Sequence, residues 1–470
     1  MSDKSPAKVI INALKRPSSV DLHALFDYVE DAPYSVLFDS AGSRESNARF
    51  NIAVWAPSLV VLAEKGNTFV IEPHSGERTF VNDKPLQVVS DLMKKRCKEY
   101  LIEDGDSKEL SEILPFIIGA AGLCSYDLGR YYEQLPSNAK NELSCPDMAI
   151  GIYEHSLIED SVTGEIFECR LSTLPPINVQ QWLNGKNTKR SFTLRSRWQA
   201  NLSKSEYTEA LHSISDYLKA GDCYQVNMAQ RFNAAYEGSE WDAYLKLKQQ
   251  NKAPFSVFMR LPHNSILSIS PERFISVDQD EVETKPIKGT RPRYADPVKD
   301  KDSSNALLNS EKDRAENLMI VDLLRNDLSK HCQPNSVNVP SLFALESYAA
   351  VHHLVSTVKG KLKPDSTAWD LIAGAFPGGS ITGAPKIRAM EIIDELEPHR
   401  RHVYCGSILY MGLRGDMDSS ILIRTLLTEN NYIYCWAGGG IVLDSIADEE
   451  YQETLDKVSR ILPVLGQRNE

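Results

Sequence analysis

Short segments rich in β-branched and aromatic residues, each closed by glycine or proline, dominate the first part of the chain. Segments of this kind predict strands, here at residues 50–54, 60–62, 69–72, 150–158 and 165–171. Helical patterns come later and in clusters, so helices and strands do not alternate regularly as they would in a doubly wound parallel sheet. The pattern therefore predicts an α+β fold.

The best candidate for a domain boundary lies at residues 174–193, which include two adjacent prolines, a glycine and a polar stretch. This composition is typical of a surface connection. We expect an N-terminal unit at residues 1–180 and a second unit at residues 203–465. In the second unit, apolar residues at helical spacing predict helices at 310–328, 385–396 and 448–462.

Composition narrows the class of protein and its partners. The chain has 470 residues, 42% of them hydrophobic and 25% charged, which is typical of a globular protein and excludes a disordered one. Its net charge of -12 would repel nucleic acid and anionic membranes, so we expect neither as a partner. The eight cysteines form no CxxC pair, and the N-terminus lacks a signal-like apolar core. We therefore expect a cytoplasmic protein with reduced thiols.

Two predicted helices each place acidic residues three positions apart, Asp313 with Glu316 and Glu450 with Glu453. Spacing of three puts both members of a pair on one helical face. Mg²⁺ is usually held by one or two carboxylates, several waters and an anionic substrate. Taken alone, acidic pairs on helices are more often solvated faces.

Two glycine-rich segments are candidates for anion binding. Residues 376–386 contain three glycines and lead into a predicted helix, so free backbone N–H groups there could bind an anion. The segment departs from a P-loop because Ala384-Pro385 follows Gly383. Residues 438–440 are three glycines that do not fit a dinucleotide fingerprint. For both segments, a tight turn between packed elements is an equally good interpretation.

Four side chains are candidates for catalysis or substrate binding. Lys288 lies in a cationic segment, and a lysine enclosed near other cations becomes a neutral nucleophile, although an exposed strand lysine is commoner. Glu272 is a candidate general acid, with pairing to Arg273 as the commoner role. His353 is more often a core histidine than a catalytic one. Arg424 lies in an apolar segment and needs a partner, for which a ligand carboxylate is a good candidate.

Together these segments resemble the chorismate-utilising enzyme family, and the resemblance covers nearly the whole chain. It runs through 34–40 and 122–130 in the first unit, and through 221–227, 270–274, 286–290, 313–327, 351–356, 378–386, 404–406, 423–425 and 450–457 in the second. The resemblance implies large, mostly antiparallel sheets packed as a sandwich with helices outside and an active site in a cleft. It also implies chorismate as the substrate.

The resemblance assigns the four acids to Mg²⁺. Glu316 and Glu453 would ligate the ion directly, and Asp313 and Glu450 would act through water. Asp313 departs from the glutamate that is often found at this position in anthranilate synthases, and its shorter side chain favours the water-bridged role. The ion would hold the ring carboxylate of chorismate.

The remaining roles follow from the same resemblance. Arg424 and Tyr404 would hold the pyruvyl carboxylate, helped by backbone N–H groups near Thr382 and Gly383. Glu272 would protonate the departing C4 hydroxyl. Lys288 would attack C2 to give a covalent intermediate, which ammonia resolves at C4. His353 would orient or electrostatically support the ring.

Lys288 decides between branches of the family, because anthranilate-forming members resemble the chain closely but have alanine there. The lysine favours the branch that forms 4-amino-4-deoxychorismate for 4-aminobenzoate and folate synthesis. Members that form isochorismate or salicylate keep the lysine but usually lack an N-terminal unit of this type. Anthranilate, isochorismate and salicylate remain alternative products.

The chain contains no recognisable glutaminase nucleophile, so we expect ammonia from a separate glutamine amidotransferase subunit in a heterodimer. A further alternative is a non-catalytic subunit that senses an aromatic amino acid. The resemblance places a possible effector pocket in the first unit, at Ser35, Leu37 and Ser40.

Overall fold

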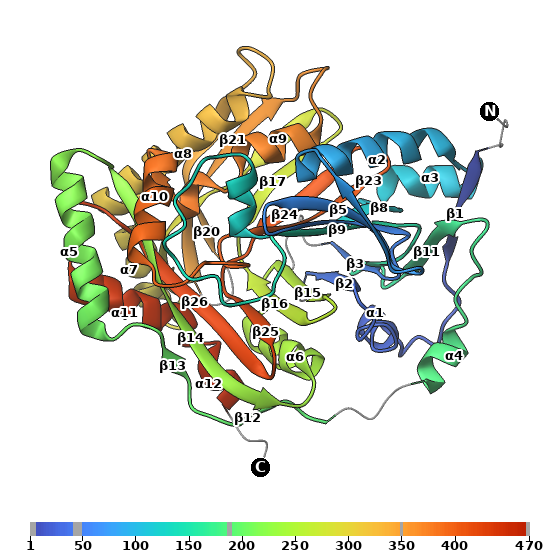
Figure 1. Ribbon diagram of the computed structural model, residues 1–470, viewed down its shortest axis with the longest axis horizontal. Coiled ribbons are helices and arrows are strands. Elements are labelled where there is room, and N and C mark those ends of the chain that lie inside the picture. Colours follow the sequence, from blue (N-terminus) through green and yellow to red (C-terminus); the bar gives the residue numbers. More distant parts are fainter. Residues whose placement is uncertain (1–5, 41–48, 186–189, 348–350, 467–470) are drawn as a thin grey trace.

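The computed structural model describes residues 6–40, 49–185, 190–347 and 351–466. Two large sheets occupy the middle of the molecule and helices lie around them (Figure 1). Nearly all strand pairs are antiparallel, with β1 and β7 as a parallel exception. This arrangement confirms the predicted α+β class and its mostly antiparallel sheets.

The first sheet has 14 strands. In spatial order they are β12 (Thr193–Leu194), β14 (Gln225–Glu237), β26 (Tyr432–Ile441), β25 (Thr425–Glu429), β16 (Asn264–Ser270), β15 (Phe255–Arg260), β2 (Val36–Asp39), β3 (Phe50–Val54), β10 (His155–Asp160), β11 (Ile166–Leu171), β1 (Ala7–Ala13) and β7 (Tyr100–Ile102), with β13 (Gln199–Ala200) and β22 (Gly383–Ala384) paired to β14.

The second sheet has 12 strands. In spatial order they are β19 (Ile287–Pro292), β21 (Val351–Lys361), β18 (Glu281–Thr284), β17 (Arg273–Asp278), β24 (Met417–Ile421), β23 (Ser407–Gly412), β8 (Gly119–Cys124), β9 (Met148–Tyr153), β4 (Leu59–Glu64), β5 (Asn67–Glu72) and β6 (Glu77–Val81), with β20 (Asn338–Ser347) paired to β21.

The helices surround these sheets. They are α1 (Leu22–Phe26), α2 (Pro85–Glu99), α3 (Asp106–Ile113), α4 (Val179–Asn184), α5 (Lys204–Ala220), α6 (Glu240–Asn251), α7 (Pro297–Leu308), α8 (Glu311–Ser329), α9 (Ala368–Ala375), α10 (Lys386–Leu396), α11 (Ala447–Val458) and α12 (Leu462–Gly466), with the 3₁₀ helices η2 (Tyr126–Tyr131) and η3 (Gly379–Ile381). None of the helices in these described ranges is long and apolar enough to cross a membrane.

Strands from both predicted units run through both sheets. In the first sheet β2 pairs with β15, and in the second β8 pairs with β23. The two sheets face each other across an apolar core, where Phe38 of β2 meets the ring of Tyr410 of β23 edge to face at 5.2 Å. The predicted units are therefore joined by backbone hydrogen bonds, and the division near residues 180–203 stays a prediction.

Local sequence signals explain the helix ends near the site. Ser310 caps α8 by accepting a hydrogen bond from the Asp313 N–H, and α10 begins directly after Pro385, as predicted. The predicted helix at 448–462 is wrong in one respect, because the structure has α11 ending at Val458 and α12 beginning at Leu462. Pro463 accounts for the break, since a proline inside one continuous helix would clash with the carbonyl four residues earlier.

Candidate active site

The glycines at 438–440 lie on strand β26 rather than in a turn. The ladder between β25 and β26 ends at the Leu426–Cys435 pair, whereas β14 continues along β26 to Ile441. Past Trp436, therefore, no strand among the described residues pairs with the edge of β26 that faces away from β14, and we call this stretch the open edge. This open edge is the framework on which the candidate site is built.

Backbone groups of Gly438 and Gly440 point toward the open edge. On β14, the N–H groups of Asn227 and Ala229 donate away from β26, to the Thr382 carbonyl at 2.8 Å and to Glu397 at 3.0 Å. Residues opposite each other in an antiparallel ladder direct their backbone groups alike, toward or away from one another. The backbone groups of Gly440 and Gly438, which lie opposite Asn227 and Ala229, therefore point away from β14. In agreement with this direction, Lys457 Nζ donates to the Gly438 carbonyl at 2.7 Å.

Helix α11 carries two of the predicted metal ligands over the middle glycine. A Cβ on Gly439 would come within 3.2 Å of Glu450 Oε2 and 3.4 Å of Glu453 Oε1, so both carboxylates lie close against this glycine. Glu450 is buried, accepts a hydrogen bond from Ser445 Oγ at 2.7 Å and lies 3.5 Å from Lys312 Nζ. Glu453 pairs with Lys457 at 2.6 Å, and this ammonium lowers the pKa of Glu453 although burial opposes the shift.

Helix α8 supplies the other two predicted ligands. Burial raises the pKa of Glu316, against the opposing charges of Lys288 and Lys312, and the negative charge of Glu450 adds to the increase. Glu316 of α8 therefore interacts electrostatically with Lys288 and with Glu450 of α11. Asp313 instead forms an ion pair with Arg291 at 2.9 Å.

The donor chemistry of these carboxylates suits Mg²⁺, which prefers oxygen ligands and keeps several waters. Glu450 and Glu453 share the space above Gly439, and Lys312 and Lys457 neutralise them. Within the described ranges, however, no three acidic, histidine or cysteine side chains come close enough to hold a metal ion by themselves. The residues fit an ion held by a pair of carboxylates together with water and substrate.

Lys288 lies on β19 at a bulge in its ladder with β21. The next residue, Gly289, has φ +75, and a Cβ there would come within 2.9 Å of Asp313, so glycine permits both the bulge and the approach of α8. Lys288 Nζ lies 3.5 Å from the Ser380 carbonyl of η3. Burial lowers the pKa of Lys288, although Glu316 and Glu272 favour its charged form. The lysine is therefore closer to a neutral amine than an exposed lysine would be.

Glu272 lies between β16 and β17, where the chain passes from one sheet to the other. Its backbone is fixed on both sides, because its N–H donates to Ser270 Oγ at 3.2 Å and its carbonyl accepts from the Ile421 N–H at 3.1 Å. The residue is 6% exposed. Burial raises the pKa of Glu272 to about 7, against the opposing charge of Lys288 and a hydrogen bond from the Ile287 N–H. A carboxyl group with this pKa can donate a proton near neutral pH.

Arg424 follows β24 and has a left-handed backbone with φ 51. Burial lowers the pKa of this guanidinium, and Arg460 adds to the effect. Among the residues that the structure places, none forms a hydrogen bond or ion pair with the guanidinium of Arg424. A partly buried guanidinium left without a partner among these residues is suited to bind an anionic ligand.

His353 lies on β21 and its Nδ1 is 2.9 Å from Thr290 Oγ1 on β19. Burial lowers the pKa of His353 to about 4, and the charge of Arg424 contributes to the decrease. The imidazole is therefore neutral at pH 7. This state agrees with a supporting role beside a ligand better than with donation of a proton.

The segment around Thr382 and Gly383 forms η3 and β22, directly beside β14. Thr382 is fully buried and its Oγ1 donates to the Gly378 carbonyl at 2.9 Å. Gly383 has φ +148, and a Cβ there would lie 2.1 Å from the Gln225 carbonyl. The close approach of this segment to β14 therefore requires glycine. Tyr404 is also buried, with its ring stacked on that of Trp436 at 6.4 Å.

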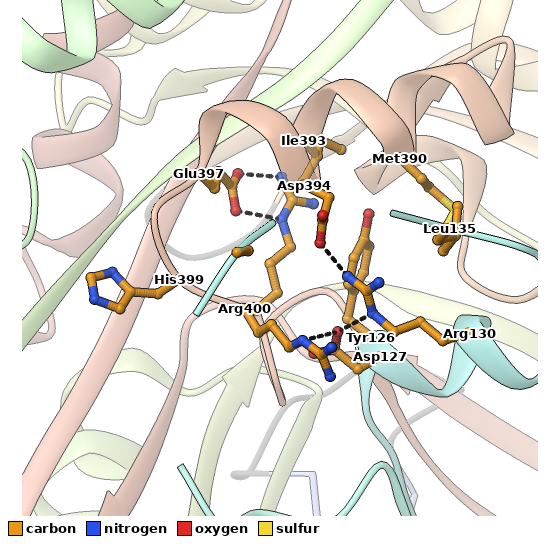
Figure 2. Close-up of a pocket in the computed structure, with 12 residues that line it drawn as sticks. Tyr126, Asp127, Arg130, Leu135, Met390, Ile393, Asp394, Glu397, His399 and Arg400 are labelled. Atoms are coloured by element: carbon orange, nitrogen blue, oxygen red, sulfur yellow. Dashed lines mark hydrogen bonds and ion pairs between the residues drawn. The ribbon is translucent and has the colours of Figure 1, made fainter. Parts of the chain in front are cut away.

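A buried ion pair between Arg401 and Glu397 anchors η3, next to Thr382. Arg401 is 1% exposed and binds both carboxylate oxygens of Glu397, at 2.6 and 3.0 Å. Its other N–H groups donate to the Ile381 carbonyl at 3.0 Å and the Asn227 carbonyl at 2.7 Å. Figure 2 shows Glu397 at the end of α10 with both oxygens bonded to this guanidinium. The pair thus ties η3 to β14.

The predicted effector residues lie on or beside β2. Ser35 Oγ donates to the Glu30 carbonyl at 3.2 Å, Leu37 is fully buried in the core, and Ser40 donates to Asn51 at 2.8 Å. These contacts account for the three side chains as parts of the fold. Their role in binding an effector stays a prediction.

The structure adds the ammonium group of Lys312, which lies 3.5 Å from Glu450 and was not predicted from the sequence. Lys457 lies four residues after Glu453 on one helical face, a spacing that the sequence shows, and its ammonium group donates to the Gly438 carbonyl. Residues 438–440 were a candidate for anion binding, but which of their backbone groups face a ligand depends on where the neighbouring ladder ends.

A family model described as "chorismate binding enzyme" matches residues 34–463. The chain belongs to the chorismate binding enzyme family. Aminodeoxychorismate synthase component 1 of Escherichia coli is 47% identical over 99% of this chain and 100% of its own length. Anthranilate synthase component 1 of Thermus thermophilus is 34% identical over 93% of this chain and 94% of its own.

A solved structure has a similar fold. Anthranilate synthase component I of Streptococcus pneumoniae superposes with a TM-score of 0.74 and 30% identity, over 89% of this chain and 93% of that one. As a chorismate binding enzyme, the chain thus has the fold that the sequence resemblance implied. The open edge of β26, Lys288, Glu272 and Arg424 remain the predicted parts of its active site.

Proposed function

We propose that the protein aminates chorismate at C4 to give 4-amino-4-deoxychorismate, the precursor of 4-aminobenzoate in folate synthesis. The relatives named aminodeoxychorismate synthase component 1 in three enteric bacteria are 45–47% identical, against 30–34% for three anthranilate synthases. The observation that carries the proposal is Lys288, a part-buried amine in the site with a lowered pKa. Lysine at this position distinguishes the proposed activity from anthranilate synthesis.

In the first step, Lys288 and Glu272 act on chorismate together. The neutral amine attacks C2, a C2–N bond forms and the ring double bonds shift toward C4. The C4–O bond breaks, and protonated Glu272 gives its proton to the leaving hydroxyl, which departs as water. Both pKa values are shifted in the direction that favours this step, since burial favours the neutral amine and the neutral acid.

In the second step, ammonia forms a bond to C4 and the C2–N bond to Lys288 breaks. The double bonds return to their original positions, and the lysine leaves with the electron pair of the broken bond. Glu272, now a carboxylate, accepts the extra proton of the new amine. The enzyme returns to its starting state. An amino group has replaced the C4 hydroxyl, with one ammonia consumed and one water released.

Charged groups around the site position the substrate. Arg424 and Tyr404 bind the pyruvyl carboxylate, with help from backbone N–H groups near Thr382 and Gly383, and neutral His353 supports the ring. Glu316 and Glu453 would hold Mg²⁺, with Asp313 and Glu450 acting through water. When bound, the ion would neutralise the ring carboxylate.

Ammonia comes from a separate glutamine amidotransferase subunit in this proposal, which makes the protein one half of a heterodimer. The "component 1" in the names of the relatives implies a second component. Glutamine-dependent activity that appears only when a glutaminase is added supports this part. Turnover of glutamine by the isolated chain contradicts it.

The test of the activity is product identification. The purified chain is incubated with chorismate, Mg²⁺ and ammonium, with and without the lyase that converts aminodeoxychorismate to 4-aminobenzoate. We expect 4-aminobenzoate only when the lyase is present. Anthranilate, isochorismate or salicylate as the product would overturn the proposal, and a complete absence of product would favour a non-catalytic subunit.

A further inference from the structure

Lys386 is the first residue of α10, and its ammonium group bonds two other helices. Its Nζ donates to the carboxylate of Asp327 on α8 and to the carbonyl of Ala375, the last residue of α9, both at 2.7 Å. The Asp327 side chain is 4% exposed and that of Lys386 is 17% exposed. The helix dipole disfavours a cation at a helix N-terminus, so this ion pair calls for an explanation.

The two bonds of Lys386 close the base of the glycine-rich segment 376–385. This segment leaves α9 directly after Ala375 and enters α10 at Lys386. The last carbonyls of a helix have no acceptor role inside it, so the Ala375 carbonyl is free to accept from the ammonium group. Asp327 then attaches both ends of the segment to α8 through one ion pair.

The middle of segment 376–385 lies against the predicted nucleophile. Its 3₁₀ helix η3 places the Ser380 carbonyl 3.5 Å from Lys288 Nζ. The same short helix packs on α8, where a Cβ on Gly379 would come within 3.3 Å of Leu323 Cβ. The place of the segment on α8 therefore determines how its backbone meets the reactive amine.

We propose that Lys386 is a positioning residue for the reaction, with its ion pair to Asp327 holding segment 376–385 where it contacts Lys288 and the substrate. The inference rests on the proposed function for the identity of the substrate and for the backbone N–H groups near Thr382 that bind it. Lys386 acts through the segment, because both of its hydrogen bonds go to groups at the segment's base.

The closest alternative is an ion pair that only stabilises the fold. Loss of such a pair lowers the free energy of unfolding but leaves kcat and the Kd for chorismate unchanged in the folded protein. Lys330, directly after α8, is a matched control, because its Nζ bonds the other oxygen of Asp327 at 3.2 Å and the Gly374 carbonyl at 3.0 Å. It thus bonds the same carboxylate and the end of α9 without belonging to the start of α10.

The experiment compares Lys386→Met, Lys386→Arg and the control Lys330→Met in the full chain. Methionine keeps an unbranched side chain without the charge, and arginine keeps the charge. Consumption of chorismate with Mg²⁺ and ammonium gives kcat and KM, and calorimetry with Mg²⁺ but without ammonium gives the Kd for chorismate. Thermal unfolding of each variant reports whether it folds.

We expect Lys386→Met to lower kcat by about 10- to 100-fold in the folded protein, as a displacement of about 1 Å near the reacting groups would do. Its Kd for chorismate should rise by about 5- to 10-fold, because a hydrogen bond from the segment is weakened. Lys386→Arg should recover most of both losses. Lys330→Met should leave kcat and Kd within about threefold, because that lysine is half exposed.

A folded Lys386→Met variant with the kcat and Kd of the parent would overturn the inference. Equal losses in Lys386→Met and Lys330→Met would also overturn it, because they would assign the effect to Asp327 and α9 rather than to the segment. If the parent binds chorismate but forms another product, the proposed function fails, while the Kd comparison among the variants still tests Lys386.

Discussion

Replacing Glu272 with glutamine should strongly lower activity and, at the same time, stabilise the protein at alkaline pH. The carboxyl group is 6% exposed, and burial raises its pKa from 4.5 to about 7. Between these two values the folded state binds more protons than the unfolded state does. Stability therefore falls as the pH rises through this window, and the loss is complete above pH 7.

The size of the effect follows from the shift. One pKa unit corresponds to 1.36 kcal/mol, so the ionised carboxylate lowers the free energy of unfolding by about 3 kcal/mol at pH 8. Glutamine has nearly the same shape, can still accept the hydrogen bond from the Ile287 N–H, and does not ionise. Glu272→Gln should thus unfold at a higher urea concentration than the parent at pH 8, and at about the same concentration at pH 4.5.

The assay is urea unfolding of both proteins at pH 4.5, 6 and 8, with chorismate turnover measured in parallel. Turnover should fall by about 10² to 10⁴-fold, the usual contribution of a general acid. In the parent, turnover should decline above pH 7 as Glu272 loses its proton. A difference in unfolding free energy between the two proteins that does not change with pH would refute the reasoning.

Three further predictions concern the other parts of the site. Lys288→Ala should lower amination by more than about 10³-fold, with some rescue at high ammonium or a shift toward anthranilate; an unchanged rate would show that Lys288 is not the nucleophile. Charge reversal at Glu316 or Glu453 should remove Mg²⁺-dependent turnover by more than about 100-fold, and full activity in excess chelator would contradict the metal assignment. Arg401→Met should lower the free energy of unfolding by about 3 to 5 kcal/mol because it leaves Glu397 buried without its cation. A loss below about 1 kcal/mol in urea unfolding would contradict a stabilising role for the Arg401–Glu397 ion pair.

Local signals were enough to predict the ends of two helices beside the candidate site. Ser310, Pro385 and the apolar spacing of α8 and α10 act within a few residues, so the ends of these helices follow from the sequence. Pro463 carries the same kind of signal, yet the amphipathic pattern of α11 continues past Val458 to Leu462 and concealed the break. Patterns of this sort do not reveal pairing between distant strands, such as β2 with β15.

The candidate site shows the same division between local and distant information. Glu450 and Glu453 could be assigned to one helical face from their spacing alone. Their contact with Gly439, and that of Asp313 with the bulge at Gly289, depend on strands far away in the sequence. The resemblance to a family supplied the connection between these segments, which spacing alone left open.

The groups assigned to chemistry gather where backbone ladders end or shift. The β25–β26 ladder stops before Gly438, the β19–β21 ladder bulges at Gly289, and Arg424 occupies the left-handed junction between β24 and β25. Inside a complete ladder every N–H and C=O is already bonded, so no backbone group is left for a ligand. Such interruptions therefore leave backbone groups available to a ligand in a fold that is otherwise made of two nearly continuous sheets. At this site, N–H groups of the glycines add positive partial charge to the charges of Arg424, Lys312 and Lys457.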